Sequence, residues 1–467
     1  MDKQESRQEE IKAVLNKQRD FFGDGGTKSF NFRSKLLKKL KKGLQRREEQ
    51  IFKALKDDLQ KPPFETYSTE LGLIIKEINH VLKNLRHWMK PEKKRASLLH
   101  LRTTARIFRQ PYGNVLIMAP WNYPLQLALV PLVDALAAGN CVMLKPSEYA
   151  PNTAKVLFEL LNDELPDQVV AVVEGGKTTG ELLLEQEFDF IFFTGSPRVG
   201  RIVMKKAADR LTPVCLELGG KCPCIVDDTV DAQISAKRIL WGKFLNAGQT
   251  CIAPDYILVT ADFKEKLIAA FKKTLKKFYG EEPRMSEDYG RIINEKHWLR
   301  LTEMLTNTEG QIICGGDYNK EDLYMAPTIV DDVTPNDVLM SEEIFGPILP
   351  VVEFVDFEQA RGIIDSYNKP LAVYLFSGNK SLQKEVVNEI PFGGGCINDT
   401  AIHVASPRFP FGGLGESGMG KYHGQAGFEL FSHQKTIFKK TRFFDIPLRY
   451  PPYRKKLAWI KKLFKWF

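Results

Sequence analysis

The sequence lacks the features that mark membrane-spanning, secreted and zinc-binding proteins. No stretch approaches the roughly 18 consecutive apolar residues of a membrane-spanning helix, and the polar, charged N-terminus does not resemble a signal peptide. The seven cysteines are odd in number and irregularly spaced, which argues against a disulfide framework and favours the reducing cytoplasm. Cys222 and Cys224 lack a second pair at zinc-finger spacing, and the apolar residues after them predict a buried strand.

Excess charge is scarce outside one short segment. The net charge is +9, but six of these positive charges belong to residues 453–467, which contain no acidic residue. The rest of the chain is therefore close to +3. Such a balance is ordinary for an enzyme and does not indicate nucleic-acid binding.

Helical and strand patterns alternate along much of the chain. Residues 1–90 show apolar positions at three- and four-residue intervals, which predict helices. Short apolar runs then lead into turns and helices from residue 115 onwards, and a second such series runs from about 219 to 395. This alternation predicts an α/β fold with a largely parallel, doubly wound sheet. Ligands of such sheets bind at the carboxyl ends of the strands, where the turns lie.

The segment from Asn246 to Cys251 carries the strongest chemical signal. Its cysteine follows polar and glycine residues, which predicts an exposed, approachable thiol. Glu217 lies 34 positions earlier and is followed by Gly219 and Gly220, which let backbone approach a ligand. A thiolate can form a covalent intermediate, and a carboxylate can activate the water that releases it. The alternatives are a structural cysteine, a salt-bridged glutamate and a cysteine protease, but no histidine occupies a recognisable partner motif.

Other candidate residues follow expected strands. Asn122 could donate its amide to a developing oxyanion, or it could simply form a turn. The spacing from Gly195 to Gly200 follows a strand and opens a helix, whose N-terminus can receive an anion. Lys145 and Glu148 offer a cation and a carboxylate for phosphate or ribose, and Glu343 offers a carboxylate from the second series. Each of these three charges could equally belong to a surface ion pair.

Together these segments resemble the aldehyde dehydrogenase superfamily, and most closely its class 3 branch of fatty and aromatic aldehyde dehydrogenases. The resemblance covers the chain to about residue 452 and rests on motifs in the family's order. They are Pro120–Pro124, Lys145–Glu148, Phe193–Ser196, Glu217–Lys221, Gly248–Cys251, Glu343–Pro347 and Pro410–Gly413, with Gly415–Gly420, Tyr422–Gly424 and Phe431–Gln434 pointing to class 3.

The resemblance implies a role for each candidate residue. Cys251 would attack the aldehyde to give a thiohemiacetal, Asn122 and the Cys251 backbone N–H would hold the oxyanion, and Glu217 would activate water to hydrolyse the thioester. Contacts to the cofactor are implied for Lys145, Glu148, Gly195, Ser196, Gly200, Glu343 and Phe345. A carboxylate at Glu148 favours NAD, although class 3 relatives can also use NADP. No metal is implied.

The resemblance also implies a domain plan and a homodimer. Residues 1–218 would form the N-terminal helices and the Rossmann-type dinucleotide-binding domain, with 100–112 as an oligomerisation hairpin. Residues 219–395 would form the catalytic α/β domain. Residues 396–452 would return to the cofactor domain and supply an oligomerisation strand, near 432–440, to the dimer.

Residues 453–467 form a separate basic tail. At helical spacing Leu457, Trp459, Ile460, Leu463, Phe464, Trp466 and Phe467 share one face, and the cations share the other except for Lys456. This pattern is typical of an amphipathic helix lying in a membrane interface. A tail that packs on the partner subunit, or a disordered basic end, is the alternative. We therefore expect a cytoplasmic enzyme, peripheral to the membrane if the helix docks.

The sequence predicts NAD(P)-dependent oxidation of a medium- or long-chain, or aromatic, aldehyde to a carboxylic acid. A coenzyme A-acylating aldehyde dehydrogenase is one alternative, which Glu217 argues against because acylation needs no activated water. The other is a catalytically silent relative that acts as a membrane-associated binding protein. The complete set of Cys251, Glu217 and Asn122 argues against a silent relative.

Overall fold

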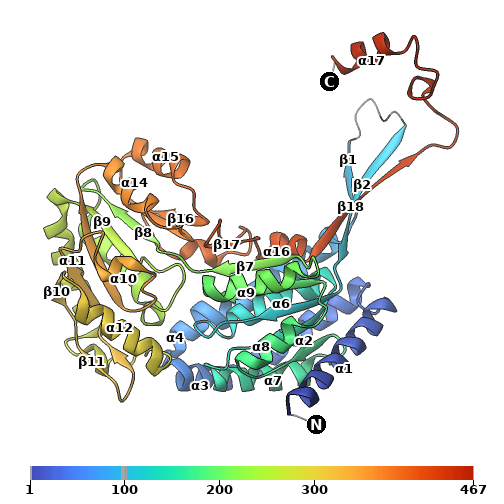
Figure 1. Ribbon diagram of the computed structural model, residues 1–467. Helices are drawn as coiled ribbons and strands as arrows, with labels where there is room; N and C mark the ends of the chain where they lie inside the picture. Colours follow the sequence, from blue (N-terminus) through green and yellow to red (C-terminus); the bar gives the residue numbers. More distant parts are fainter. Residues whose placement is uncertain (1–2, 96–99, 101, 466–467) are drawn as a thin grey trace.

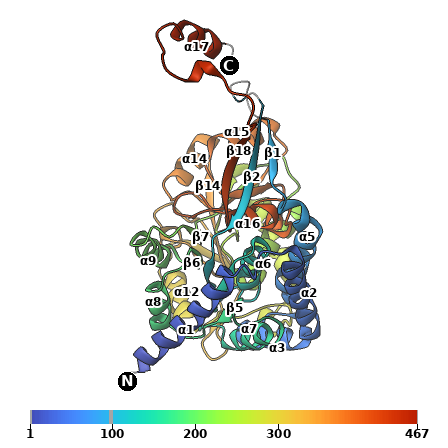
Figure 2. The same cartoon turned by 90° about the vertical axis from the view of Figure 1, so that its right-hand side faces the viewer.

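The computed structural model of the chain describes residues 3–95, 100 and 102–465. Two α/β lobes lie side by side, and a narrow three-stranded sheet, here called the arm, projects from the first lobe (Figure 1). The N-terminal helices cover the first lobe, and the C-terminal segment leaves the end of the arm (Figure 2).

The N-terminal region is helical, as the apolar spacing predicted. It contains α1 (Lys3–Gly23), α2 (Phe30–Arg46), α3 (Glu48–Leu59), α4 (Pro63–Thr66), the π-helix η1 (Tyr67–Leu71) and α5 (Gly72–Trp88). The periodic residues Ile74, Ile78, Val81 and Leu85 of α5 are fully buried. The helices are therefore held by their apolar faces, which pack on the lobe.

The first lobe contains a six-stranded sheet in the order β17-β7-β6-β3-β4-β5. Its strands are β3 (Asn114–Met118), β4 (Cys141–Lys145), β5 (Val170–Val172), β6 (Phe190–Gly195), β7 (Val214–Leu218) and β17 (Gly418–Met419). All neighbours are parallel except β17, which runs antiparallel to β7. The helices between them are α6 (Gln126–Ala138), α7 (Pro151–Glu164), α8 (Lys177–Leu184) and α9 (Pro197–Ala208).

Alternate residues of these strands enter two different apolar clusters. Leu116 and Met143 pack with α1, α8 and α9, whereas Val115, Ile117 and Val142 belong to the larger cluster on the other face. A sheet covered on both faces needs strands that are apolar throughout. This explains the continuous apolar runs in the sequence and confirms the doubly wound fold.

The second lobe contains a seven-stranded sheet in the order β10-β13-β14-β9-β8-β15-β16. Its strands are β8 (Pro223–Val226), β9 (Tyr256–Thr260), β10 (Gln311–Cys314), β13 (Thr328–Asp331), β14 (Ile348–Phe354), β15 (Ala372–Phe376) and β16 (Gly394–Ile397). Its helices are α10 (Ala232–Phe244), α11 (Ala261–Tyr279), α12 (Glu295–Asn307), α13 (Val338–Ser341), α14 (Phe357–Asp365) and α15 (Lys380–Glu389), and β11 (Tyr318–Asn319) pairs with β12 (Tyr324–Met325) beside it. The buried strand expected after Cys222 is β8.

The chain changes sheet between β7, which ends at Leu218, and β8. The second sheet extends to Ile397, because β16 pairs with β15. A domain boundary after residue 218 stays a proposal, and we place the end of the second domain after β16. The remaining short elements are α16 (Gly424–Leu430) and four 3-10 turns, η3 (Leu245–Gly248), η4 (Pro283–Met285), η5 (Ile402–Ala405) and η6 (Pro447–Arg449).

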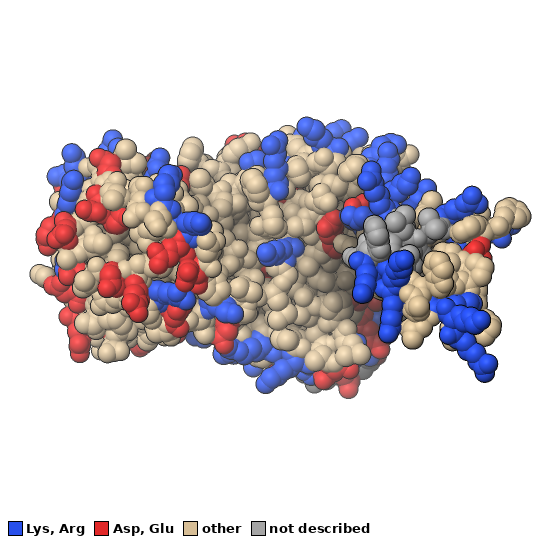
Figure 3. All heavy atoms as spheres, turned by 90° about the horizontal axis from the view of Figure 1, so that it is seen from above, with Lys and Arg blue, Asp and Glu red and all other residues tan. Residues whose placement is uncertain are grey.

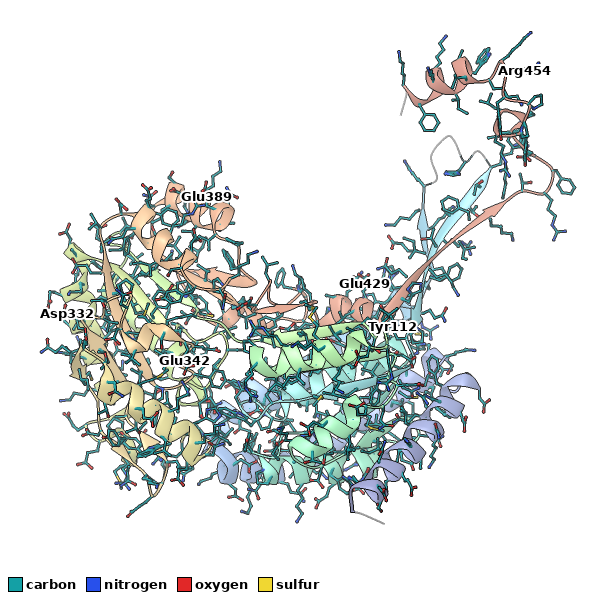
Figure 4. The ribbon with its side chains drawn as sticks, viewed as in Figure 1. Tyr112, Asp332, Glu342, Glu389, Glu429 and Arg454 are labelled. Carbon is teal, nitrogen blue, oxygen red and sulfur yellow. The ribbon has the colours of Figure 1, made fainter. Side chains whose placement is uncertain are left out.

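The arm consists of β1 (Glu92–Lys94), β2 (Thr103–Pro111) and β18 (Ser432–Lys440). The strand expected within 100–112 is β2, and it pairs antiparallel with β18 along its whole length. The hairpin is formed with the preceding strand β1 rather than within 100–112. Tyr112 and Glu429 mark the base of the arm, and Arg454 lies beyond its end (Figure 4).

Three features hold for the residues that the structure describes. No helix among them is long and apolar enough to cross a membrane. They contain no group of three or more His, Cys, Asp or Glu side chains arranged to hold a metal ion. All seven cysteines lie in described positions and are free thiols.

A glycine pair tests the packing of α16 on α6. A Cβ added at Gly427 would lie 1.9 Å from Oδ2 of Asp134, a buried carboxylate oxygen that accepts the backbone N–H of His423, whereas a Cβ at Gly362 of α14 would meet nothing within 4 Å. Gly427→Ala should lower the free energy of unfolding by about 1 to 3 kcal/mol through overpacking. Gly362→Ala should leave it unchanged or raise it by up to about 1 kcal/mol, because alanine favours helix. Urea unfolding of both variants measures this, and equal stabilities would contradict the packing argument.

Candidate active site

The candidate residues of the first lobe all lie at one edge of its sheet. Asn122 follows β3, Lys145 ends β4, Gly195 ends β6 and Glu217 lies near the end of β7. These strands are parallel, so their carboxyl ends meet at the same edge, as expected from the sequence.

The loop with Cys251 is fixed in an unusual conformation. Asn246, Ala247 and Gly248 have φ values of 53°, 52° and 77°, three successive left-handed residues. Only glycine takes this conformation freely. A Cβ at Gly248 would also lie 2.2 Å from the carbonyl oxygen of Gly346, so the loop passes directly against the 342–347 segment. The side chains of Asn246 and Gln249 are buried and help to hold this shape.

Cys251 is partly buried, which corrects the expectation of an exposed thiol. The polar residues before it do not face solvent, because their side chains bond to backbone groups inside the fold. Burial raises the pKa of the Cys251 thiol above its ordinary value, and the nearby carboxyl groups of Glu343 and Glu217 add to this. Both effects disfavour the thiolate form of Cys251.

Asn122 is tied to the Cys251 loop by its side chain. Its Nδ2 donates a hydrogen bond to the carbonyl of Gln249 at 3.0 Å, and its own carbonyl accepts one from Nδ2 of Asn246 at 2.7 Å. A side-chain amide has two N–H donors, so this arrangement orients the group and leaves the second donor available. The residue is buried.

Glu217 is buried and poorly hydrogen-bonded. Its Oε1 accepts a weak bond from the thiol of Cys215 at 3.8 Å, and its Oε2 has no partner among the described residues. Burial raises the pKa of this carboxyl well above its usual range. A carboxylate so placed is a stronger base than a solvated one and has a free oxygen to meet a ligand or water.

The residues expected at the cofactor lie at the helix ends of the first lobe. Ser196 is the N-cap of α9 and its side chain makes no capping hydrogen bond; the next residue, Pro197, has no N–H, and the N–H of Val199 donates to the Ser196 carbonyl at 3.1 Å. Gly200 packs closely on Leu218, because a Cβ there would lie 2.7 Å from that side chain. Nζ of Lys145 lies 3.0 Å from Oε2 of Glu148, so these two form the ion pair that the sequence left open.

Glu343 and Phe345 approach from the second lobe. A Cβ on Gly219 would lie 2.0 Å from Oε2 of Glu343, so the glycine makes room for this carboxyl group beside Glu217. Burial raises the pKa of Glu343 to about 8, with the charge of Asp255 contributing. Phe345 has a positive φ and its ring lies edge-on to Trp121, with 5.4 Å between ring centroids.

Two residues that position this segment did not stand out individually in the sequence. Nζ of Lys221 is buried and donates to Oδ2 of Asp255 at 2.7 Å and to the carbonyls of Leu339 and Glu342. Oδ1 of Asp255 accepts from the backbone of Ile344 at 3.0 Å. The pair thus fixes the loop marked by Glu342 (Figure 4). The only signal was that Lys221 ends the motif that begins with Glu217.

The structure brings the three reactive candidates together and places the others around them. Asn122 and Cys251 are linked through Gln249, and Glu217 and Glu343 both lie close enough to Cys251 to affect its pKa. Lys145, Glu148, Ser196 and Gly200 lie farther along the edge of the first sheet. The arrangement places a thiol, a side-chain amide and a carboxyl group at the junction of two lobes.

Comparison with known proteins gives a consistent result. The aldehyde dehydrogenase family profile matches residues 1–437. A 4,4'-diaponeurosporen-aldehyde dehydrogenase from Staphylococcus aureus is 46% identical over 446 residues, covering 95% of this chain and 97% of that protein. The human aldehyde dehydrogenase family 3 member B1 is 46% identical, covering 94% of each chain.

A solved structure gives the same answer for the fold. The substrate-bound state of Staphylococcus aureus AldH superposes with a TM-score of 0.95 at 44% identity, covering 97% of this chain and 99% of that one. The similarity therefore extends over both lobes and the arm, and it confirms the resemblance to class 3. This chain belongs to the aldehyde dehydrogenase family, whose members oxidise aldehydes with NAD(P).

Proposed function

We propose that this aldehyde dehydrogenase works through Cys251 as nucleophile, Asn122 as oxyanion donor and Glu217 as general base. The observation that carries the proposal is the hydrogen bond from Asn122 to the Cys251 loop, beside a buried carboxyl group with a free oxygen. These are the parts that covalent oxidation of an aldehyde requires.

In the first step the Cys251 thiol releases its proton to solvent, and its sulfur joins the aldehyde carbon. The carbonyl oxygen becomes an oxyanion, which the second N–H of Asn122 and the Cys251 backbone N–H stabilise. NAD(P)+, when bound, supplies the acceptor for the hydride that leaves this carbon. The product on Cys251 is a thioester, still held by the same donors.

The second step releases the acid. Glu217 takes a proton from a water molecule, whose oxygen attacks the thioester carbon and breaks the carbon–sulfur bond. The sulfur leaves as thiolate, and the carboxylic acid departs. A carboxyl group acts as a base only in its ionised form. Because burial raises the pKa of Glu217, this form becomes abundant at a higher pH than for an ordinary glutamate.

The residues at the first sheet suit NAD(P). The N-terminus of α9 at Ser196 would hold a pyrophosphate, and Lys145 with Glu148 would meet the adenosine ribose. Glu343 would contact the ribose on the nicotinamide side. We propose NAD as the preferred form, because the Glu148 carboxylate would repel a 2′-phosphate.

The substrate proposed is a medium- or long-chain, or aromatic, aldehyde. Support comes from the Staphylococcus aureus relative, whose name specifies a diaponeurosporen aldehyde. In this chain the rings of Trp121, Phe345 and His297 form an aromatic cluster next to Asn122. Such a surface favours apolar over small hydrophilic aldehydes.

The nucleophile is tested by Cys251→Ala. NADH formation from a long-chain aliphatic aldehyde without coenzyme A should fall to background, because no covalent intermediate can form. Cys314→Ala, which removes another partly buried thiol from β10, should keep wild-type activity. Absence of NADH or NADPH formation by the wild-type enzyme with every aldehyde tried would favour the catalytically silent alternative.

The base is tested by Glu217→Gln. Thioester hydrolysis should slow by about a hundredfold while the first turnover of NADH persists, since the base is needed only after acylation. In the wild type, the hydrolysis rate should rise with pH as the carboxyl loses its proton, well above the usual carboxyl pKa of about 4. Stopped-flow kinetics across pH measures both, and the variant should lack this rise.

Coenzyme A serves as the control for the acylating alternative. If wild-type turnover depends on added coenzyme A and gives an acyl-thioester product, Glu217 is not a hydrolytic base here. Product analysis by mass spectrometry separates free acid from acyl-coenzyme A.

We propose that the chain forms a homodimer through its arm. Within the described chain β18 pairs only with β2, so its other edge is open for pairing with a second copy. Ile437 and Phe438 on β18 are exposed, which favours burial in an assembly.

We also propose that the tail docks on an anionic membrane. Helix α17 (Leu457–Phe464) projects from the body beyond the arm, and its Leu457, Trp459 and Phe464 are at least 60% exposed (Figure 1). Lys456, the exception on the helical wheel, instead bonds to the carbonyls of Pro447 and Tyr450. The side chain of Leu463, and Trp466 and Phe467, lie outside the described residues.

The arm adds positive charge beside the tail. A hollow on its face is lined by Arg102, Arg106, Lys439 and Lys440, and Lys and Arg side chains gather over this end of the molecule (Figure 3). Apolar side chains with surrounding cations are the combination that binds anionic lipid surfaces.

Truncation at Pro451 should abolish sedimentation with phosphatidylserine vesicles and leave turnover of a soluble aldehyde unchanged. Replacing Lys461, Lys462 and Lys465 by Glu should have the same effect with the apolar face intact, because the electrostatic attraction is lost. Neutral phosphatidylcholine vesicles provide the control. Unchanged vesicle binding by the truncated enzyme would refute membrane docking, and loss of the dimer instead would assign the tail to the partner subunit.

A further inference from the structure

A buried ion pair lies beneath Asn122, outside the residues assigned above. Nζ of Lys61 is 2.5 Å from Oε1 of Glu70, and both side chains are completely buried. Glu70 lies in the π-helix η1, whose wider turn is uncommon and recurs at functional sites. Taking two charges out of water is costly, so such a pair is weak evidence of a stabilising role alone.

Both members of this pair contact the segment that carries Asn122. Nζ of Lys61 donates to the Asn122 carbonyl at 3.3 Å and lies 4.2 Å from the centre of the Tyr123 ring. Oε2 of Glu70 accepts the backbone N–H groups of Leu125, at 2.9 Å, and Gln126. The pair therefore fixes the turn between β3 and α6 from below.

A second carboxyl group from the same short region holds the Cys251 loop. Oε1 of Glu65 accepts the backbone N–H of Asn246 at 2.7 Å. Asn246 is the first of the left-handed residues, so this bond secures the most strained point of the loop. Burial raises the pKa of Glu65 to about 7, while the charge of Lys61 lowers it.

The Lys61–Glu70 ion pair and the Glu65 carboxyl group contact two segments that belong to different lobes. Asn122 follows β3 of the first sheet, and Asn246 precedes Cys251 after α10 of the second. Direct hydrogen bonds also exist, from Asn122 to the Gln249 carbonyl and between the hydroxyl groups of Tyr123 and Thr250 at 2.7 Å. Residues 61–70 thus contact both sides of the junction.

We propose that Lys61, Glu65 and Glu70 are positioning residues that align the Asn122 amide with the Cys251 sulfur for the acylation step. The inference rests on the proposed roles of Asn122 and Cys251. Oxyanion stabilisation requires donors held in place before the charge develops, and a displacement of about 1 Å can cost about a hundredfold in rate. None of the three residues needs to touch the substrate.

Two substitutions of Glu65 separate positioning from packing. Glu65→Leu removes the acceptor for the Asn246 N–H and keeps the volume, whereas Glu65→Gln keeps an acceptor oxygen. We expect the first turnover of NADH to slow by at least about tenfold in Glu65→Leu and to be largely restored in Glu65→Gln. The KM for NAD should stay unchanged, because the cofactor residues lie elsewhere.

The ion pair is removed as a whole by the double variant Lys61→Met and Glu70→Gln. This avoids leaving one buried charge unpaired, which would threaten folding. Gln still offers an oxygen to the Leu125 and Gln126 N–H groups. The first turnover should again slow by at least about tenfold.

Lys264→Met is the matched control for lost charge interactions. Lys264 is largely buried and pairs with Asp331, Asp332 and Glu353 in the second lobe, and Asp332 marks its outer edge (Figure 4). This variant should lower thermal stability without slowing the first turnover. An equal slowing in Lys264→Met would show that the effect is general destabilisation and would overturn the inference.

A measurement without cofactor or substrate completes the test. Amide hydrogen exchange at residues 245–251 should be faster in Glu65→Leu than in wild type or Glu65→Gln, because the loop loses its anchor. Wild-type exchange and first-turnover rates in Glu65→Leu would overturn the inference. A wild-type enzyme that produces no NADH would overturn the proposed function instead, and loop protection would still be measurable.

Discussion

The site depends on one constraint, the backbone of residues 246–248 in three consecutive left-handed conformations. Such a run is unfavourable for residues other than glycine, so it persists only where surrounding contacts compensate for it. Here the compensation comes from buried amide hydrogen bonds to Asn122 and Gln249 and from Gly346, against which Gly248 packs. The loop is therefore one place where the two lobes contact each other, and its geometry sets where the Cys251 sulfur lies.

Burial controls the electrostatics of the same region. The thiol of Cys251 and the carboxyl groups of Glu217 and Glu343 all have raised pKa values because water is excluded from them. Three such groups cannot all be ionised close together at low cost. Burial therefore disfavours the charged forms of all three groups.

Much of the fold could be predicted from the sequence, because its signals are local. A helix packed on a core needs the apolar spacing seen in α5, and strands covered on both faces need the apolar runs of β3, β4 and β6. The glycines after Glu217 likewise indicate a turn that depends only on nearby residues. The exposed thiol was wrongly predicted, because the polar residues before Cys251 satisfy buried backbone groups instead of water and leave Cys251 partly buried. Lys61, Glu65 and Glu70 gave no signal, since a charged residue in a helical segment has the same local pattern whether it is exposed or buried.

By itself the sequence determined the family and the alternation of strands and helices, and it singled out Cys251, Glu217 and Asn122 as candidate residues within their motifs. Tertiary structure alone decided how far these groups are buried, which of them share hydrogen bonds, and that the 61–70 segment lies beneath both Asn122 and Asn246. The physical reason is the distance along the chain over which each effect acts. Periodicity and turn preferences act over a few residues, whereas desolvation and ion pairing depend on which distant segments exclude water from a side chain.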